Sequence, residues 1–533
     1  MASPKSPQNI YYGYTGDDTI SKRNASLTAY AQYTKDIKDV HHFDIMGGYE
    51  WQHFWQHRNS DGWGVYPSTS PDAGKQTDHD PYEYLTENYI VSFFGRANYS
   101  LLNRYLLTAT VRYDGSSRFR DHWALFPSFA FAWKIKEESF LRDNNAISDL
   151  KLRLGWGQTG QQEGIGDYNY AAVYNVNNGT KTFYPVTGDG TLYRPKAYDP
   201  TLRWETTTTS NIGLDFGFLH GRLTGSIDAY YRLTTDLLNK ADVPAGTNFR
   251  NQVMTNIGSL SNKGIELSLE GRIVETKDWF WTVSGNLTYN INRIESLVGG
   301  DKDYTVYTGG ISSGTSNTVQ AHRVGYPAYS FLVYKQIYDT EGKPIENAVV
   351  DLVNDGQINE SDLYMYHSPY APWTAGLSSR LEWRNFDLGF SLRANIGNYV
   401  FNDREAGQAN VSPNELWALS TYLGNRPRAA LDNAWQTYNT TAILSDYHVK
   451  NASFLKMDNI TLGYSFTNLF GGIFYRDFTP IEEKGFDGRV FVTANNVFCL
   501  TKYNGIDPEV FGGIDNNIYP RPFTLLFGVT LNF

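Results

Sequence analysis

Apolar and polar residues alternate with a period of two along most of this chain. In the segment RYLLTATVRY (104–113), Tyr105 and Leu107 occupy one set of alternate positions, and Arg104 and Thr108 occupy the other. The same alternation recurs at 211–218, 223–232, 265–270 and 386–393. Successive side chains of a β-strand point to opposite faces, so the pattern predicts strands with one apolar and one polar face.

The length of these runs separates two architectures that use such strands. A soluble β-sandwich exposes one face to water and has strands of about five or six residues. A transmembrane β-barrel turns its apolar face to lipid and its polar face to an aqueous lumen, with strands of about 9–11 residues. The runs here are mostly ten to fourteen residues, with Tyr, Phe and Trp at their ends. We therefore predict an all-β fold, an antiparallel transmembrane β-barrel, over a large soluble β-solenoid or propeller.

Loop lengths give the strands a direction, because outer-membrane barrels have tight turns at one rim and long loops at the other. The tight connections include 36–39, 101–103, 219–222 and 384–385. The long connections, which we expect outside the cell, are 56–87, 160–203, 237–256, 295–370, 401–447 and 500–521. The strand-like segment 330–339 would reverse the rims if it spanned the membrane, so we place it within a long extracellular loop.

This reading predicts fifteen spanning strands: 24–35, 40–55, 88–100, 104–113, 123–134, 149–159, 204–218, 222–236, 257–270, 279–292, 371–383, 386–399, 452–466, 487–499 and 522–533. Bacterial single-chain barrels have even strand counts, and an open edge in lipid leaves backbone groups unpaired. We therefore expect residues 1–533 to be the C-terminal part of a larger barrel, completed by strands that this chain does not contain.

Composition narrows the class of protein further. Aromatic residues make up 15% of the chain, and the net charge of -10 disfavours nucleic acid as a partner. The single cysteine, Cys499, excludes an internal disulfide. The sequence has no run of about eighteen apolar residues, so it predicts no transmembrane helix. The first residues, MASPKSPQNI, have no apolar segment of a signal peptide.

Six irregular segments occur in a fixed order and are more specific than the alternation. They are RYDGSSRF (112–119), LFPSFAFAW (125–133), LKLRLGWGQTG (150–160), LRWETTTTSNIGLDFGF (202–218), NIGSLSNKGIELSL (256–269) and RVFVTANNVFCLTKYNGIDPEV (489–510). Together they resemble the barrel of SusC/RagA-type TonB-dependent transporters of Bacteroidetes, over nearly the whole chain.

The resemblance implies an outer-membrane barrel of twenty-two strands with an N-terminal plug, a TonB-contacting segment and a surface lipoprotein lid of the SusD type. It also implies import of bulky nutrients, mostly glycans and in some members peptides. On this basis the chain supplies about fifteen of the expected twenty-two strands, whereas the plug domain and the N-terminal strands are absent from it. The partners expected are the SusD-like lipoprotein, TonB, the remaining strands and the plug.

The segment DLVNDGQINESD (351–362) resembles a calcium-binding loop with Gly356 at its sharp turn. The candidate ligands are Asp351, Asp355, Gln357, Asn359 and Asp362. Val353 stands where an oxygen donor belongs, and Asp362 replaces the usual glutamate, so the loop departs from the family pattern. The alternative is an Asx-rich turn that only shapes the loop. Calcium is the only cofactor that the sequence suggests.

Aromatic residues in the long loops are candidates for substrate contact, because sugar rings present apolar C–H faces that stack on aromatic rings. The candidate residues are Trp63, Tyr66, Tyr168, Tyr170 and Tyr174. The alternatives are interfacial girdles, loop packing and contact with the lipoprotein lid. Trp51 and Trp55 lie near the predicted membrane boundary, and the girdle fits them better.

We expect no enzymatic activity, because the scattered Ser, His and Asp residues cannot be assembled into a catalytic triad from the sequence. His53 and His57 have the i, i+4 spacing that would place both side chains on one face of a helix. They fall at the end of a predicted strand, so this spacing does not indicate a metal site. Our main hypothesis is outer-membrane import of glycans by a SusC–SusD-like, TonB-dependent transporter. The alternatives are a peptide importer of the RagA type, a passive porin, and a surface barrel without a transport role.

Overall fold

The structure is a computed structural model that describes residues 14–532 apart from 65–74, 76–81, 178–191, 245, 247, 249, 299–300, 315–316, 409–431, 434, 436–438, 470, 477–478, 484 and 517. Within these described residues, no helix is long and apolar enough to cross a membrane. Most of the described chain is antiparallel strand, and the helices are short and confined to connections.

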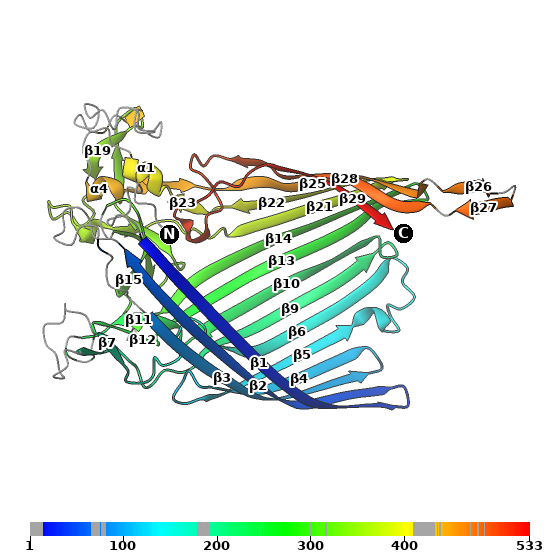
Figure 1. Cartoon of the computed structure of the whole chain (residues 1–533), viewed down its shortest axis with the longest axis horizontal. Helices are drawn as coiled ribbons and strands as arrows, with labels where there is room; N and C mark the ends of the chain where they lie inside the picture. The colour runs from blue at the N-terminus through cyan, green and yellow to red at the C-terminus, as the bar shows by residue number, and fades with distance from the viewer. Residues whose placement is uncertain are drawn as a thin grey trace. The chain divides into compact units, whose positions relative to one another are not determined.

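Fifteen antiparallel strands form one sheet whose strand order follows the sequence (Figure 1). They are β1 (Tyr14–Ile37), β2 (His41–Gly64), β3 (Tyr82–Leu101), β4 (Tyr105–Ser116), β5 (Trp123–Lys134), β6 (Ile147–Gln161), β9 (Glu205–Phe218), β10 (Leu223–Thr235), β13 (Ser259–Glu275), β14 (Trp279–Ser296), β21 (Trp373–Trp383), β22 (Phe386–Ile396), β25 (Phe454–Leu469), β28 (Phe486–Thr501) and β29 (Thr524–Asn532). Each predicted strand corresponds to one of these, so the prediction of fifteen is confirmed.

Several strands are longer than predicted at the end that carries the long loops. β1 and β2 each have 24 residues and pair without interruption from Tyr14↔Gly64 to Ile37↔His41. Beyond the predicted limits of 24–35 and 40–55, both faces carry polar residues, for example Asp18 on one face and Asp17 on the other. Backbone pairing continues there although the alternation ends, which is why the sequence pattern did not reveal these extensions.

The tight turns at the opposite end adopt a backbone that matches strand twist. Lys38 and Asp39 have φ of 55° and 53°, and Leu102 and Asn103 both have φ of 54°. Each pair is closed by a hydrogen bond between the flanking residues, such as Val40 N–H to the Ile37 carbonyl at 3.1 Å. Positive φ at both central residues is the signature of the type I′ turn, whose twist suits a two-residue hairpin.

The chain divides into two compact units. Unit 1 contains Met1–Phe131, Trp156–Thr208 and Thr234–Ile257, and unit 2 contains Ala132–Gly155, Thr209–Leu233 and Gly258–Phe533. In unit 1, Phe119, Phe126, Ile165, Leu202 and Trp204 form a buried cluster beneath the loops. The short hairpins β7 (Tyr174–Asn177) with β8 (Leu192–Pro195), and β11 (Leu238–Asp242) with β12 (Gln252–Asn256), belong to the same loops.

Unit 2 carries a folded assembly of loops, which we call the loop body. Its elements are β15 (Thr305–Gly310), β16 (Thr318–Arg323), β17 (Ser330–Val333), β18 (Gln336–Tyr338), β19 (Pro344–Val349), β20 (Tyr364–Met365), β23 (Tyr399–Phe401), α1 (Asp403–Gln408), α4 (Thr440–Ile443) and β24 (Val449–Asn451). They surround a buried core that includes Val319, Phe331, Val333, Phe401 and Ile443.

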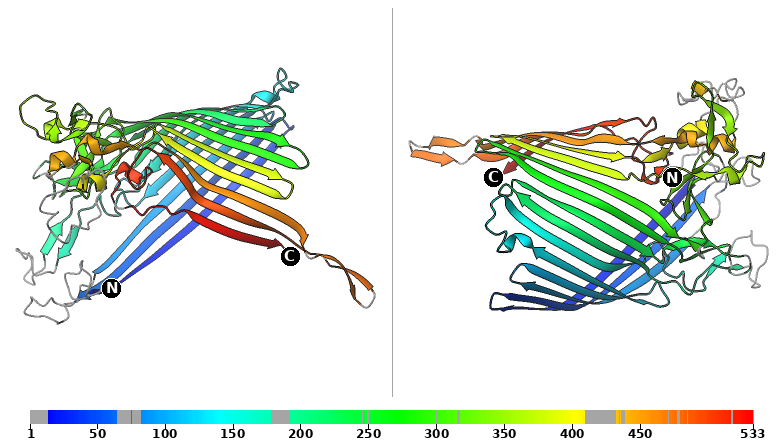
Figure 2. Two further views of the ribbon diagram at one scale, coloured as in Figure 1. Left: turned by 90° about the horizontal axis from the view of Figure 1, so that it is seen from above. Right: turned by 180° about the vertical axis from the view of Figure 1, so that it is seen from behind.

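The loop body confirms that segment 330–339 does not span the membrane. Its strands β17 and β18 pair with β16, β20 and β19, and none of these joins the fifteen-stranded sheet. At the opposite end of the unit 2 strands, the connection between β25 and β28 contains a projecting hairpin of β26 (Gly472–Arg476) and β27 (Thr479–Glu483), as Figure 2 shows.

Candidate functional site

Aromatic residues bracket the apolar face of unit 2. Trp383, at one end of β21, lies 5.5 Å from Trp279 between ring centroids. Trp373, at the other end, lies 4.5 Å from Tyr289. Ten residues of strand, tilted by about 45°, span roughly 25 Å, which is the height of the apolar band of an outer-membrane barrel. Exposed Leu377 sits between these two aromatic belts, so this face has the form of a lipid-facing surface.

The opposite, polar face carries charges that are paired across neighbouring strands. In unit 2, Arg153 lies 2.8 Å from both Asp215 and Asp228, and Arg489 lies 2.5 Å from Asp387. In unit 1, the Arg112 guanidinium contacts Glu50 and Asp114, each at 2.7 Å. These side chains therefore satisfy one another within the sheet, which leaves a hydrated surface with little uncompensated charge.

A hollow of about 680 Å³ lies on the polar face of unit 2. Small polar side chains line it, among them Ser226, Ser268, Ser284, Asn286, Ser378 and Ser391. Short side chains leave this volume open, and their hydroxyl and amide groups can hydrogen-bond to whatever fills it.

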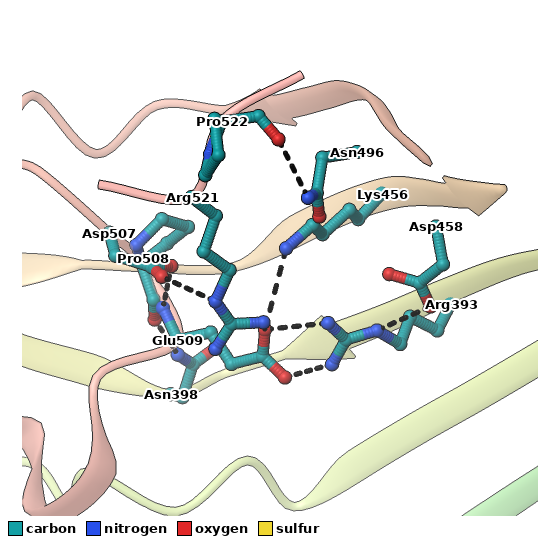
Figure 3. A network of polar contacts seen from close by, with 10 residues as sticks. All are labelled: Arg393, Asn398, Lys456, Asp458, Asn496, Asp507, Pro508, Glu509, Arg521 and Pro522. Atoms are coloured by element: carbon teal, nitrogen blue, oxygen red, sulfur yellow. Dashed lines mark hydrogen bonds and ion pairs between the residues drawn. The ribbon is translucent and has the colours of Figure 1, made fainter. Parts of the chain in front are cut away.

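The β28–β29 connection (502–522) folds onto this polar face (Figure 3). Its Glu509 carboxylate pairs with the Arg393 guanidinium, with Arg521 at 3.0 Å and with Lys456 at 3.8 Å. Arg393 occupies an alternate position of β22 that also includes Asp387, and its Nε donates to Asp458 at 2.6 Å. The register between β25 and its neighbours shifts at Asp458. This β-bulge leaves the residue outside the ladder, free to meet Arg393.

The tip of this connection is held against the loop body. The Gln320 amide donates to the Gly512 carbonyl at 2.7 Å, and the Asp515 N–H donates to the Phe401 carbonyl at 2.9 Å. Gly513 has a φ of 75°, and an added Cβ would lie 2.3 Å from Pro369. Only glycine suits both the backbone and the space. Immediately before the first of these anchors, the Phe511 side chain is 97% exposed.

The loop body buries a titratable cluster around Glu405. One carboxylate oxygen lies 3.5 Å from His448 Nδ1 and 3.4 Å from Lys450 Nζ, and the other accepts the Asn504 amide at 3.1 Å. Burial lowers the pKa of His448, although Glu405 acts in the opposite direction. Burial alone would raise the pKa of Glu405, but its contacts with His448 and Lys450 outweigh this and leave that pKa lowered. The imidazole is therefore neutral in the folded loop body at pH 7.

We expect the loop body to open more readily as the pH falls from 7.5 to 5.5. His448 has an ordinary pKa of 6.5 when exposed, so the opened form binds a proton as the pH falls through that value. Burial lowers the pKa of His448 in the folded form, which therefore binds a proton only at lower pH. Hydrogen exchange of Val449–Asn451, corrected for intrinsic rates, measures this opening. Peptides from β14 serve as the reference, and equal protection at both pH values in both segments would contradict the prediction.

The predicted calcium loop is an Asx-rich turn in the structure. The Asp362 carboxylate accepts the N–H groups of Leu352 and Asn359 at 2.8 and 2.9 Å, and Asp351 accepts that of Gly356 at 2.8 Å. Asp355 accepts the Gln357 N–H at 2.8 Å. The described residues contain no group of three or more His, Cys, Asp or Glu side chains that could hold a metal ion. These contacts do not strengthen the case for calcium, which stays a prediction.

The predicted substrate aromatics lie on different surfaces. Tyr170 packs against the buried cluster of unit 1, whereas Tyr168 and Tyr174 are exposed. Trp63 belongs to the alternate positions of β2 that also hold Trp51 and Trp55, opposite the face of Glu50 and its partner Arg112. Tyr66 lies outside the described residues. The structure thus does not gather these residues, and their contact with substrate stays a prediction.

Sequence reasoning missed Tyr82 and Tyr84, because the predicted third strand began at 88. These residues occupy the same alternate positions of β3 as Thr86 and Asn88, and the segment YEYLTEN is the signal that could have shown this. The role of Glu509 was also missed, since its partner Arg393 lies 116 residues away in sequence.

Comparison with known proteins identifies the family. Residues 3–497 match the family described as TonB dependent receptor-like, beta-barrel. The chain is 49% identical to the TonB-dependent receptor SusC of Bacteroides thetaiotaomicron over 544 residues, which cover 100% of this chain and 52% of that protein. A TonB-dependent receptor of Formosa agariphila is 28% identical over 577 residues, covering 100% of this chain and 56% of that receptor.

Among solved structures, the RagAB peptide transporter superposes with a TM-score of 0.78 at 25% identity, covering 98% of this chain and 56% of that one. The chain spans about half the length of the relatives it matches. The matched sequences are named as receptors and the matched structure as a transporter, in agreement with the expectation of no enzymatic activity. The chain belongs to the TonB-dependent receptor β-barrel family, as a SusC/RagA-type barrel of the outer membrane.

Proposed function

We propose that this chain forms part of the wall through which a TonB-dependent transporter imports bulky nutrients across the outer membrane. The observation that carries the proposal is the polar face of the sheet, with internally paired charges and an open hollow, opposite an apolar face with two aromatic belts. Such a division suits an aqueous path inside a lipid-embedded barrel. The identity of 49% to SusC supports it.

The partners proposed are a plug domain, TonB, a SusD-like surface lipoprotein and further barrel strands. Within the described sheet, β1 and β29 each have only one neighbour. An unpaired strand edge in lipid costs several kcal/mol per backbone group, so both edges are paired in the membrane, and the proposed partners of these edges are the further strands. The hollow lined by serines is the proposed contact surface for a plug, and the loop body, which is built from long connections, is the proposed contact for a surface lipoprotein.

The substrates proposed are glycans, with peptides as the second candidate. Glycans are favoured by the amide side chains and aromatic rings on the polar face of unit 1, which suit hydroxyl groups and sugar rings. Peptides are favoured by the likeness to RagAB, which is named a peptide importer.

Uptake by the full-length transporter in whole cells tests the proposal. We expect labelled oligosaccharides, offered beside a labelled peptide pool, to enter only when the transporter is present, and uptake to stop when a protonophore collapses the energy supply of TonB. Uptake that survives the protonophore would favour the passive porin. Energy-dependent uptake of peptides alone would show that the substrates are peptides and not glycans.

A further inference from the structure

Three neighbouring strands of unit 1 bring a set of amides onto one face. Across β1, β2 and β3, Asn24 pairs with Phe54, which pairs with Asn88. One step nearer the long loops, Lys22 pairs with Gln56, which pairs with Thr86. Directly opposed residues of adjacent strands have their Cβ atoms about 5 Å apart on the same face. Glu50, whose partner is Arg112, belongs to the same alternate positions of β2, so this is the polar face.

These rows enclose a cavity of about 490 Å³. Its lining includes Asn24, Gln52, Phe54, Gln56, Asn88 and Gln162. This volume falls within the range of about 300–1,000 Å³ that small-ligand sites occupy. Five of these six side chains are primary amides, and each amide presents both donors and an acceptor.

The floor of the cavity is fixed, whereas two of its amides are free. Asn88 is 6% exposed, and its amide donates to Asp167 at 3.1 Å. Asp167 is held in turn by Arg118 at 2.9 Å. Within the described part of the chain, the side chains of Asn24 and Gln56 make no hydrogen bond, and the Phe54 ring has no aromatic partner. The floor of the cavity is therefore rigid, whereas the exposed Asn24 amide, the half-buried Gln56 amide and the Phe54 ring are accessible to a ligand.

The charges of the lining residues and the aromatic residues at the rim of the cavity both favour a neutral ligand with ring-shaped apolar faces. Arg118 and Asp167 neutralise each other, and Lys22 and Glu163 contribute one charge of each sign to the lining. Towards the long loops, Tyr82 and Tyr84 occupy alternate positions of β3 in line with Thr86 and Asn88, and their rings stack at 6.3 Å. Both are exposed, which extends the aromatic surface beyond the cavity.

We propose that this cavity is a saccharide subsite for a neutral oligosaccharide. Adjacent hydroxyls of one sugar residue hydrogen-bond to the amides of Asn24 and Gln56, and the C–H face of the ring packs on Phe54. The next sugar residue of the oligosaccharide reaches Tyr84. The inference rests on the proposed function and deepens it, because it assigns the substrate class to named residues of the import path.

Calorimetric titration of the purified, assembled transporter tests this subsite. The probes are oligosaccharides of α-glucan, β-glucan, fructan and xylan, and a mixed peptide pool. Starting from the probe that binds the unaltered protein, we expect Phe54→Ala and Gln56→Ala each to weaken binding about tenfold, as the loss of about 1.4 kcal/mol implies. Phe54→Trp, which retains a stacking face, is expected to keep most of the affinity.

His57→Ala is the matched control, because His57 lies next to Gln56 on the opposite face, where it contacts Glu83 at 2.8 Å. Migration of unheated samples in gels confirms that each variant is folded, and Phe54→Trp replaces Phe54→Ala if the latter does not assemble. Unchanged saccharide affinity in folded Gln56→Ala, while energy-dependent glycan uptake persists, would overturn the subsite but not the importer. Binding of peptides and of none of the saccharides would overturn the subsite and the glycan proposal together.

Discussion

Leu377→Arg is expected to prevent assembly of the barrel, whereas Ser378→Arg, one residue away, is expected to be tolerated. Leu377 lies midway between the aromatic belts at Trp373 and Trp383, on the apolar face. An arginine on the lipid face at the midplane costs about 2–4 kcal/mol. Ser378 lines the open hollow of the polar face, where an added guanidinium remains hydrated.

The amount of folded protein in outer-membrane fractions, judged by its shifted migration without heating, measures this difference. Leu377→Ala serves as the control for loss of side-chain volume without charge, and it is expected to assemble. Equal loss of folded protein in Leu377→Arg and Ser378→Arg would show that the two faces have been assigned wrongly.

Glu509→Gln is expected to release the β28–β29 connection from the polar face. Glu509 joins Arg393, Lys456 and Arg521, so loss of its charge leaves three cations without their common partner. Removing one member of a fully buried pair costs about 3–5 kcal/mol. The side chains of Arg393 and Glu509 are 33% and 22% exposed, and solvent screening reduces the expected cost to about 1–3 kcal/mol.

Hydrogen exchange across 502–522 measures the release. Glu382→Gln is the matched control, because Glu382 also pairs with an arginine of the polar face, Arg380 at 2.7 Å, but both side chains are more exposed and no loop depends on them. Faster exchange is expected in Glu509→Gln alone. Unchanged protection of 502–522 would show that the contacts of Gln320 and Asp515 suffice to hold the connection.

Most strands of the sheet can be predicted from local sequence, because the apolar face and the polar face of the sheet lie in different environments. The alternation at 104–113 and 386–393 reports that difference directly, and both segments are strands of the sheet at nearly the predicted limits. Prediction was poorest where the two faces are alike. The extensions of β1 and β2 to Tyr14 and Gly64 carry polar residues on both sides, so no period-two signal marks them.

The candidate site was less predictable, since it is built from residues far apart in the chain. The saccharide subsite takes its amides from three strands and from Gln162, and sequence alone gave no reason to group Gln56 with Asn88. Tyr170 was a candidate because it is an aromatic residue of a long loop, but in the structure it packs against a buried cluster. Composition identifies residue types suited to a ligand, but it does not distinguish a ring that faces a cavity from one that fills a core.

Sequence by itself therefore determined the strands, their order, the two rims and the assignment of an apolar and a polar face. These properties depend on residues two positions apart and on connection lengths, and both can be read directly from the amino-acid sequence. Tertiary structure decided the loop body, the anchoring of Glu509 by Arg393, and the cavity above Asn88. Each of these depends on pairing between strands and on contacts across tens to hundreds of residues, such as Gln320 with Gly512 at a separation of 192, and only the folded chain brings such partners together.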